Sequence, residues 1–137
     1  MTERPSPATR RKNAERRGRR GETLAALILM AKGYRILGRR VRTRAGEIDL
    51  IARSPFGVVC FVEVKVRPDG LVAAESVSAR QQARIARAAA LFMATRPRLG
   101  RKGVRFDVMT VCPGSLPRHL RDAWRPDDRR EWRSGAA

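Results

Sequence analysis

Apolar residues first cluster between residues 21 and 32, where their spacing predicts a helix. Residues 24–31 are apolar on nearly every side of such a helix, which predicts that it is deeply packed. Gly33 follows as a residue suited to ending it. Apolar, strand-like runs then predict three strands, a weak one over 34–42 and two clearer ones over 47–53 and 58–67.

A tight turn joins the two clear strands and sets how they pair. Pro55 presets the backbone for a turn, and Gly57 accepts a left-handed conformation. A three-residue hairpin loop over 55–57 would use both residues. Ser54 would then pair with Val58.

The same register brings together residues that carry chemistry. Counting back along both strands from the turn pairs Asp49 with Glu63. Directly opposed residues in a sheet have Cβ atoms roughly 5 Å apart. Alternation places Lys65 on the same face as Glu63. The sequence therefore predicts two facing carboxylates with a lysine one step along the strand.

A second helix and a final strand complete the pattern. Ser78 opens the helix, with Gln81 placed for a capping box, and Pro97 limits it to about residue 96. Residues 104–111 read as a strand. The order is αβββαβ, and the helical crossover implies that the strands on either side of it are parallel. The fold class predicted is α/β, with a mixed sheet flanked by helices.

The two ends of the chain differ in composition from the middle. Residues 1–17 are Arg-rich and are expected to form a flexible basic arm. The domain itself is expected to span 18–112, with an irregular segment at 68–77. Residues 113–137 are charged and rich in proline, which predicts a C-terminal extension.

The chain is strongly basic, and this narrows the choice of partner. Its 137 residues carry a formal net charge of +18. A field of that sign attracts phosphate backbones or anionic lipid, and nucleic acid is the more common partner. The lone histidine, His119, excludes mechanisms that need two. With no secretory signal and no apolar run of membrane-spanning length, a cytoplasmic protein without a membrane partner is expected.

Acidic residues within apolar strands call for an explanation in so basic a chain. Facing carboxylates at Asp49 and Glu63 destabilise a sheet unless one is protonated or a cation lies between them. Carboxylate oxygens with few other ligands suit Mg²⁺ or Mn²⁺. Lys65 could then orient a metal-bound water. The alternative is a salt-bridge cluster of the same three residues on an exposed sheet face.

Several strings in the chain resemble a known family. Asp49 followed by Glu63-Val64-Lys65 resembles the PD-(D/E)XK nuclease signature in its D…ExK form. Together with residues 21–22, 42–52, 61–67, 77–78 and 105–108, it resembles the bacterial YraN family, which is similar to archaeal Holliday-junction resolvases.

This resemblance implies a resolvase-like αβββαβ fold and a set of roles. Asp49 and Glu63 would be metal ligands, the Val64 carbonyl a third, and Lys65 the catalytic lysine. Glu22 matches an acid that resolvase-like enzymes use near the metal. Its alternative role is that of a first-turn carboxylate favoured by the helix dipole.

Nucleic-acid contacts are expected from arginines near these motifs and along the second helix. Where the family often has Lys, this chain has Gln81, which adds no charge. Arg105 and Asp107 share a strand face and are expected to pair. The predicted nucleic-acid-binding residues are Arg42, Arg44, Arg67, Arg80, Gln81, Arg84 and Arg87.

Two functions of different classes remain open from the sequence. The first is a metal-dependent endonuclease that hydrolyses phosphodiester bonds in DNA, with structure selectivity left open. The second is a non-catalytic basic module that binds DNA or RNA on a nuclease-like fold. Resolvase-like enzymes act as dimers, so a homodimer is also left open.

Overall fold

The computed structural model describes residues 4–67 and 77–126. Residues 68–76, expected to be irregular, and residues 127–137 of the expected extension lie outside this part. In chain order the elements are α1 (Pro7–Ala31), β1 (Arg35–Thr43), β2 (Gly46–Arg53), β3 (Val59–Val66), α2 (Ala79–Ala94), the 3₁₀ helix η2 (Leu99–Lys102), β4 (Val104–Val111) and β5 (Arg118–Trp124).

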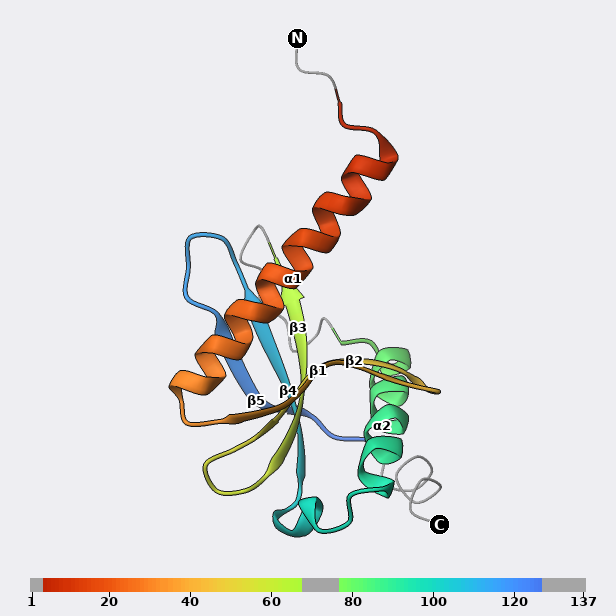
Figure 1. The fold of residues 1–137 in the computed structure, drawn as a ribbon, viewed down its shortest axis with the longest axis vertical. Coiled ribbons are helices and arrows are strands. Elements are labelled where there is room, and N and C mark those ends of the chain that lie inside the picture. Colours follow the sequence, from red (N-terminus) through yellow and green to blue (C-terminus); the bar gives the residue numbers. More distant parts are fainter. Residues whose placement is uncertain (1–3, 68–76, 127–137) are drawn as a thin grey trace.

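The strands form one mixed sheet in the order β1-β2-β3-β4-β5. The β3–β4 pair is parallel, and the other pairs are antiparallel. The predicted order αβββαβ and the parallel pair across the helical crossover are confirmed, and a fifth strand follows. The fold class is that expected, a mixed α/β arrangement consistent with a resolvase-like fold (Figure 1).

Each face of the sheet is covered by one helix (Figure 1). Ala25, Ala26 and Leu29 of α1 pack with Leu50, Cys60 and Val62 of the sheet. Ile85, Ala89 and Phe92 of α2 pack on the opposite face, with Ile51, Phe61 and Phe106. A sheet buried on both faces explains why β3 begins with four consecutive buried residues, a run that strict alternation with solvent would not allow.

The β2–β3 turn forms as the sequence predicts. Ser54 and Val58 close the loop, since the Ser54 N–H donates to the Val58 carbonyl at 2.8 Å. The Ser54 hydroxyl in turn accepts from the Val58 N–H at 3.0 Å. Strand pairs run back from this turn in the expected register as far as Leu50 opposite Val62.

Strand β2 changes direction near Asp49. Ile48 and Ile51 both pack in the cluster beneath α2, whereas Leu50 packs in the cluster beneath α1. In a regular strand, residues two positions apart share a face, so Ile48 and Leu50 would lie on the same side. Alternation is therefore broken between Ile48 and Ile51. The neighbouring strand bends at the same level, because Arg40 has a left-handed φ of 49°. The β1–β2 hairpin therefore curves over α2.

Helix α1 differs from the prediction in two ways. It begins at Pro7, with Ser6 as its N-cap, so most of the expected flexible arm is helical. The physical reason is that Ala, Arg and Glu favour helix without tertiary contacts. The helix is also less deeply packed than expected, because Leu24, Leu27 and Met30 are 38%, 55% and 55% exposed. Its N-terminal half extends beyond the sheet (Figure 1).

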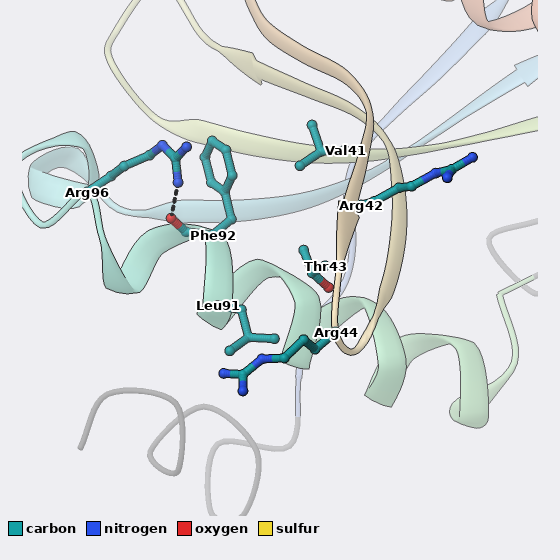
Figure 2. Close-up of a pocket in the computed structure, with 7 residues that line it drawn as sticks. All are labelled: Val41, Arg42, Thr43, Arg44, Leu91, Phe92 and Arg96. Carbon is teal, nitrogen blue, oxygen red and sulfur yellow. Dashed lines mark hydrogen bonds between the residues drawn. The ribbon is translucent and has the colours of Figure 1, made fainter.

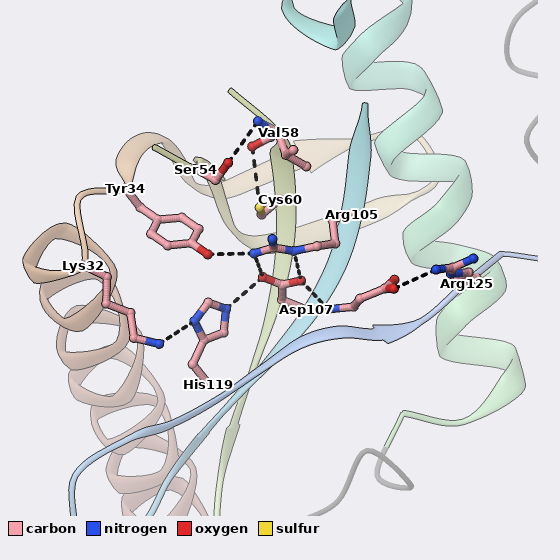
Figure 3. Close-up of polar contacts among 10 residues, drawn as sticks. Lys32, Tyr34, Ser54, Val58, Cys60, Arg105, Asp107, His119 and Arg125 are labelled. Carbon is pink, nitrogen blue, oxygen red and sulfur yellow. Dashed lines mark hydrogen bonds and ion pairs between the residues drawn. The ribbon is translucent and has the colours of Figure 1, made fainter. Parts of the chain in front are cut away.

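Strand β5 corrects the expected domain boundary at residue 112. It pairs with β4, so the sheet continues to Trp124. The strand is held by polar contacts as well as by its ladder. Asp107 is fully buried and accepts from Arg105 Nε at 2.8 Å and from the Asp122 N–H at 2.9 Å, while His119 Nε2 lies 2.8 Å from its other oxygen (Figure 3).

The expected Arg105–Asp107 pair is thus confirmed, and His119 lies within the domain. His119 Nδ1 is 3.0 Å from Lys32 Nζ, and Arg105 donates to the Tyr34 hydroxyl at 2.7 Å. This network joins the end of α1 to β4 and β5. Among residues 4–67 and 77–126, no helix combines the length and the apolar character needed to cross a bilayer.

Candidate active site

Asp49 lies where strands β2 and β3 part. Their ladder of paired residues ends at Leu50 and Val62, although both strands continue. Beyond that pair the Asp49 side chain supplies the contact, since its Oδ2 accepts from the Val64 N–H at 2.8 Å. Asp49 is thereby fixed beside the segment that contains Glu63.

Burial and neighbouring acids strongly perturb Asp49. Desolvation and the charge of Glu63 raise the pKa of Asp49 to about 7, against the lowering effect of the Val64 hydrogen bond. The Glu22 carboxylate raises it further, as does a hydrogen bond with Glu63. Two buried carboxylates in contact share one negative charge near neutral pH unless a cation joins them.

Lys65 places a positive charge beside Glu63. Its Nζ lies 3.4 Å from Glu63 Oε1, and the two side chains are only 12% and 13% exposed. The expected neighbours Glu63 and Lys65 are therefore in contact, and the Asp49 carboxylate interacts with Glu63 from β2. The predicted ladder pair of Asp49 with Glu63 is not formed, because the strands part before it, but Glu63 interacts with both Asp49 and Lys65.

Glu22 reaches the same region from α1. It is buried, and its carboxylate forms an ion pair with Arg40 Nε at 2.5 Å. The alternative of a first-turn carboxylate is wrong, because α1 begins at Pro7 and Glu22 lies well inside it. Gly21, the preceding residue, has no side chain to hold the helix off β3, since a Cβ there would lie 2.7 Å from Val66.

Arg40 is the site residue that sequence reasoning missed. Between the strand pairs Arg39–Leu50 and Val41–Ile48 lie Arg40 of β1 and Asp49 of β2. The left-handed backbone at Arg40 thus occurs at the level of Asp49, and its side chain neutralises Glu22. Nothing in an Arg-rich sequence distinguishes this arginine from its neighbours.

The site offers some, but not all, of the oxygen ligands that a hard divalent cation needs. Asp49 and Glu63 provide carboxylate oxygens, and their mutual repulsion is what a cation would relieve. Within the described ranges, however, no group of three or more His, Cys, Asp or Glu residues is arranged to hold a metal. Any ion would therefore depend on two carboxylates, a carbonyl and water, a set that suits Mg²⁺ or Mn²⁺ better than Zn²⁺.

Residues 21–111 match the family model described as uncharacterised protein family UPF0102. The chain belongs to this family. A UPF0102 protein of Parvibaculum lavamentivorans is 50% identical over 113 residues, or 82% of this chain and 84% of the relative. UPF0102 proteins of Maricaulis maris and Mesorhizobium japonicum are each 48% identical, over 86% and 90% of this chain and 92% and 97% of their own lengths.

The resemblance to the YraN family is thus confirmed as membership of UPF0102. The matched residues include Glu22, Asp49, Glu63 and Lys65. The names of these relatives assign no activity to UPF0102.

Most of the arginines expected to bind nucleic acid lie on the β1–β2 hairpin and on α2. Arg84 of α2 packs its stem against the β1–β2 turn, where a Cβ on Gly46 would lie 2.9 Å from Arg84 Cδ. The hairpin and α2 therefore present their basic residues side by side. Exposed members of this set are Arg42, Arg44, Arg80, Arg84 and Arg87, whereas Arg67 is half-buried at the end of β3.

Gln81 has a structural role in addition to the one expected. Its Oε1 accepts from the Ser78 N–H at 3.2 Å, and its own N–H donates to the Ser78 hydroxyl at the same distance. The predicted capping box is therefore confirmed. A nucleic-acid contact by Gln81 stays a prediction.

Proposed function

We propose that this UPF0102 protein is a metal-dependent endonuclease that hydrolyses phosphodiester bonds in DNA. The observation that carries the proposal is the half-buried pair of Asp49 and Glu63, with the Lys65 ammonium beside Glu63. Holding the Asp49 carboxylate beside Glu63 costs stability, because burial and the Glu63 charge both disfavour its ionised form. The pair lies where β2 and β3 part, so backbone groups of β3 such as the Val64 carbonyl are not used by the β2–β3 ladder. A strongly perturbed carboxylate in such a place is typical of a catalytic site.

Each residue then has a definite task. Asp49 and Glu63 would hold Mg²⁺ or Mn²⁺, with the Val64 carbonyl as a further donor. The bound ion would polarise the scissile phosphate and make a water more acidic. Lys65 would orient the attacking water and offset negative charge that develops on the phosphate.

Glu22 and Arg40 would act as positioning residues. The ion pair between them ties α1 to the bend in β1, at the level of Asp49. It also limits how strongly the Glu22 charge acts on Asp49. Glu22 would contact the metal only through water while Arg40 holds its carboxylate.

DNA would approach over the hairpin and α2. Arg42 and Arg44 are exposed on the hairpin, and Arg80, Arg84 and Arg87 are exposed on α2, where Arg84 packs against the β1–β2 turn. Arginine clusters of this kind bind phosphates and give strong salt dependence. DNA as a substrate implies a cytoplasmic location, and a homodimer would supply the two active sites needed to cut paired strands.

A non-catalytic nucleic-acid-binding module is the second candidate. It is favoured by the two ion pairs, Glu63–Lys65 and Glu22–Arg40, which neutralise Glu63 and Glu22 without a metal. In that case the site would stabilise the fold, and the basic surface alone would carry function.

A cleavage assay separates the two candidates. Linear, nicked, flapped and four-way branched DNAs are incubated with the protein in Mg²⁺ or Mn²⁺. We expect cleavage of at least one substrate, and losses of about 100-fold or more for Asp49→Asn and Lys65→Met. Glu47→Gln is the matched control, because Glu47 lies on the same strand but pairs with Arg42 at the surface. Binding without metal-dependent cleavage of any substrate would favour the second candidate.

A further inference from the structure

A groove lies between strand β1 and the C-terminal half of α2 (Figure 2). Its volume is about 580 Å³, which falls within the range of small-ligand sites. Val41, Leu91 and Phe92 give it an apolar floor. Arg44 and Arg96 lie at its margins, whereas the side chain of Arg42 points away from Arg96 (Figure 2).

The guanidinium of Arg96 is held in a defined position. One of its nitrogens donates to the Phe92 carbonyl at 2.8 Å and to the Thr95 hydroxyl at 3.0 Å. Its Cζ lies 3.9 Å from the centroid of the Phe92 ring. The residue is nevertheless exposed. Arg96 is therefore an ordered cationic plane with a side available to a ligand, rather than a freely rotating charge.

The groove and Asp49 belong to the same β1–β2 hairpin. Val41, on the groove floor, pairs with Ile48, and Asp49 follows Ile48 in β2. One residue along a strand is roughly 3.3 Å. A DNA strand that runs along this hairpin from a scissile phosphate at Asp49 and Glu63 would bring a neighbouring nucleotide toward the groove.

We propose that this groove binds one unpaired nucleotide of the DNA substrate, with its base against Arg96 and the apolar floor. Arg44 would contact a flanking phosphate. The inference rests on the proposed function and adds a substrate class to it, DNA with an unpaired nucleotide beside the cleavage point. Phosphate binding alone explains the arginines but gives no use for an apolar floor. A base has a flat face that stacks on guanidinium planes, and every base offers one.

The small extent of the site limits it to a single nucleotide. Proteins that bind long single strands use several aromatic residues in succession. Here Phe92 is buried, and one of its faces is covered by Arg96. The groove therefore suits a flap, gap or junction rather than extended single-stranded DNA.

A binding experiment in EDTA tests this site without depending on cleavage. Fluorescence anisotropy measures the Kd of the full chain for a duplex, for the same duplex with a short flap, and for that flap with abasic sites in place of its bases. Arg96→Lys keeps the charge but loses the plane. Arg98→Lys, at an exposed arginine two residues away, is the matched control.

We expect the wild type to bind the flapped DNA more tightly than either other probe. Arg96→Lys should weaken flap binding roughly fivefold or more and leave duplex and abasic binding within about twofold. Arg98→Lys should change none of the three. Equal effects of Arg96→Lys on normal and abasic flaps would overturn the inference, because the groove would then bind phosphate only. Tighter binding of a fluorescent octaglutamate than of the flap would instead identify an acidic protein partner. Either result leaves the endonuclease proposal to the cleavage assay.

Discussion

The carboxylate of Asp49 accepts a hydrogen bond from the Val64 backbone N–H, across the gap that opens between β2 and β3. A side chain here replaces the ladder bond that the parting strands no longer make. The bond keeps Asp49 between the strands, in contact with Glu63, although two carboxylates repel one another. The site is therefore held together by the backbone of β3, and its unfavourable charge is available to a ligand.

Metal binding should depend on pH through Asp49. The pKa of Asp49 is raised to about 7 by burial and by Glu63, so the residue is largely protonated in the metal-free protein below that pH. A cation must displace this proton. Mn²⁺ affinity should rise about tenfold per pH unit up to pH 7 and then level off. Titration calorimetry at pH 6, in two buffers of different ionisation enthalpy, should show release of about one proton; affinity independent of pH would contradict the site.

Asp49→Asn should stabilise the metal-free protein at neutral pH. The pKa of Asp49 is higher in the folded state, so the folded protein holds this proton after the unfolded chain has lost it. The free energy of unfolding of the wild type therefore falls between about pH 4 and pH 7 and stays at the lower value above pH 7. The shift from 3.8 to about 7 sets an upper bound of roughly 4 kcal/mol.

Urea denaturation at several pH values measures this effect. The variant should equal the wild type near pH 4 and exceed it by one to a few kcal/mol at pH 8. Mn²⁺ should raise the melting temperature of the wild type only. If Asp49→Asn instead lowers stability at pH 8, Asp49 belongs to a stabilising salt-bridge cluster and the second candidate function is favoured.

The sequence was sufficient for the parts of the fold that local chemistry decides. The Pro55–Gly57 loop set the β2–β3 register as far as Leu50 opposite Val62. The strands part before the predicted Asp49–Glu63 ladder pair, and Asp49 meets Glu63 through its side chain instead. The capping box at Ser78 marked the start of α2. In each case a turn or cap residue and its hydrogen-bond partner lie a few positions apart, so a single chain segment contains the whole signal.

The remaining features depend on partners that are distant in sequence. Strand β5 has a poor apolar pattern and is held through Asp107, so the segment reads as a charged tail. The role of Arg40 depends on Glu22, which lies on another element. The outer side of α1 reads as core because Leu27 and Met30 are apolar, yet the sheet covers only one side of that helix.

Asp107→Asn should strongly destabilise the protein. Burial alone would raise the pKa of Asp107, but hydrogen bonds from His119, Arg105 and the Asp122 N–H outweigh it and lower the pKa. Removing the charge leaves Arg105 and His119 around a neutral group, at a cost of about 3–5 kcal/mol. Because the folded pKa is lowered, this contribution is full above about pH 4 and fades as pH falls further.

Asp122→Asn is the matched control for Asp107→Asn. Asp122 has a left-handed φ of 51°, which Asn tolerates, and its exposed carboxylate pairs only at the surface with Arg125. The change should cost under about 1 kcal/mol. Thermal melts at pH 7 and pH 3.5 compare the two variants. A cost for Asp107→Asn no larger than that of the control would mean that the network does not anchor β5.

The N-terminal half of α1 should contribute to DNA binding through charge. Arg10, Arg11 and Lys12 are exposed on this half, which extends beyond the sheet (Figure 1). Each phosphate that such a residue neutralises adds about 0.9 to the slope of log affinity against log salt. Deleting residues 1–17 should therefore flatten that slope by at least about 2, measured by anisotropy between 50 and 200 mM salt. An unchanged slope would show that this segment does not touch phosphate.

The backbone and the side chain of Arg40 should have opposite effects on the stability of the protein. Its φ of 49° costs an L-residue roughly 1–2 kcal/mol, a cost that Gly does not bear. Arg40→Ala and Arg40→Gly both deprive buried Glu22 of its ion pair, but the Gly variant should be the more stable by about 1 kcal/mol in urea.

Arg39 provides the control, since it is exposed and lacks the left-handed backbone, so Arg39→Gly should be less stable than Arg39→Ala. An uncompensated Glu22 would also raise the pKa of Asp49 further, because the Glu22 charge already does so. In both Arg40 variants Mn²⁺ binding should therefore begin at higher pH than in the wild type, whereas the Arg39 variants should leave it unchanged. An Arg40→Gly protein with wild-type stability and wild-type pH dependence would show that the Glu22–Arg40 pair does not position the site.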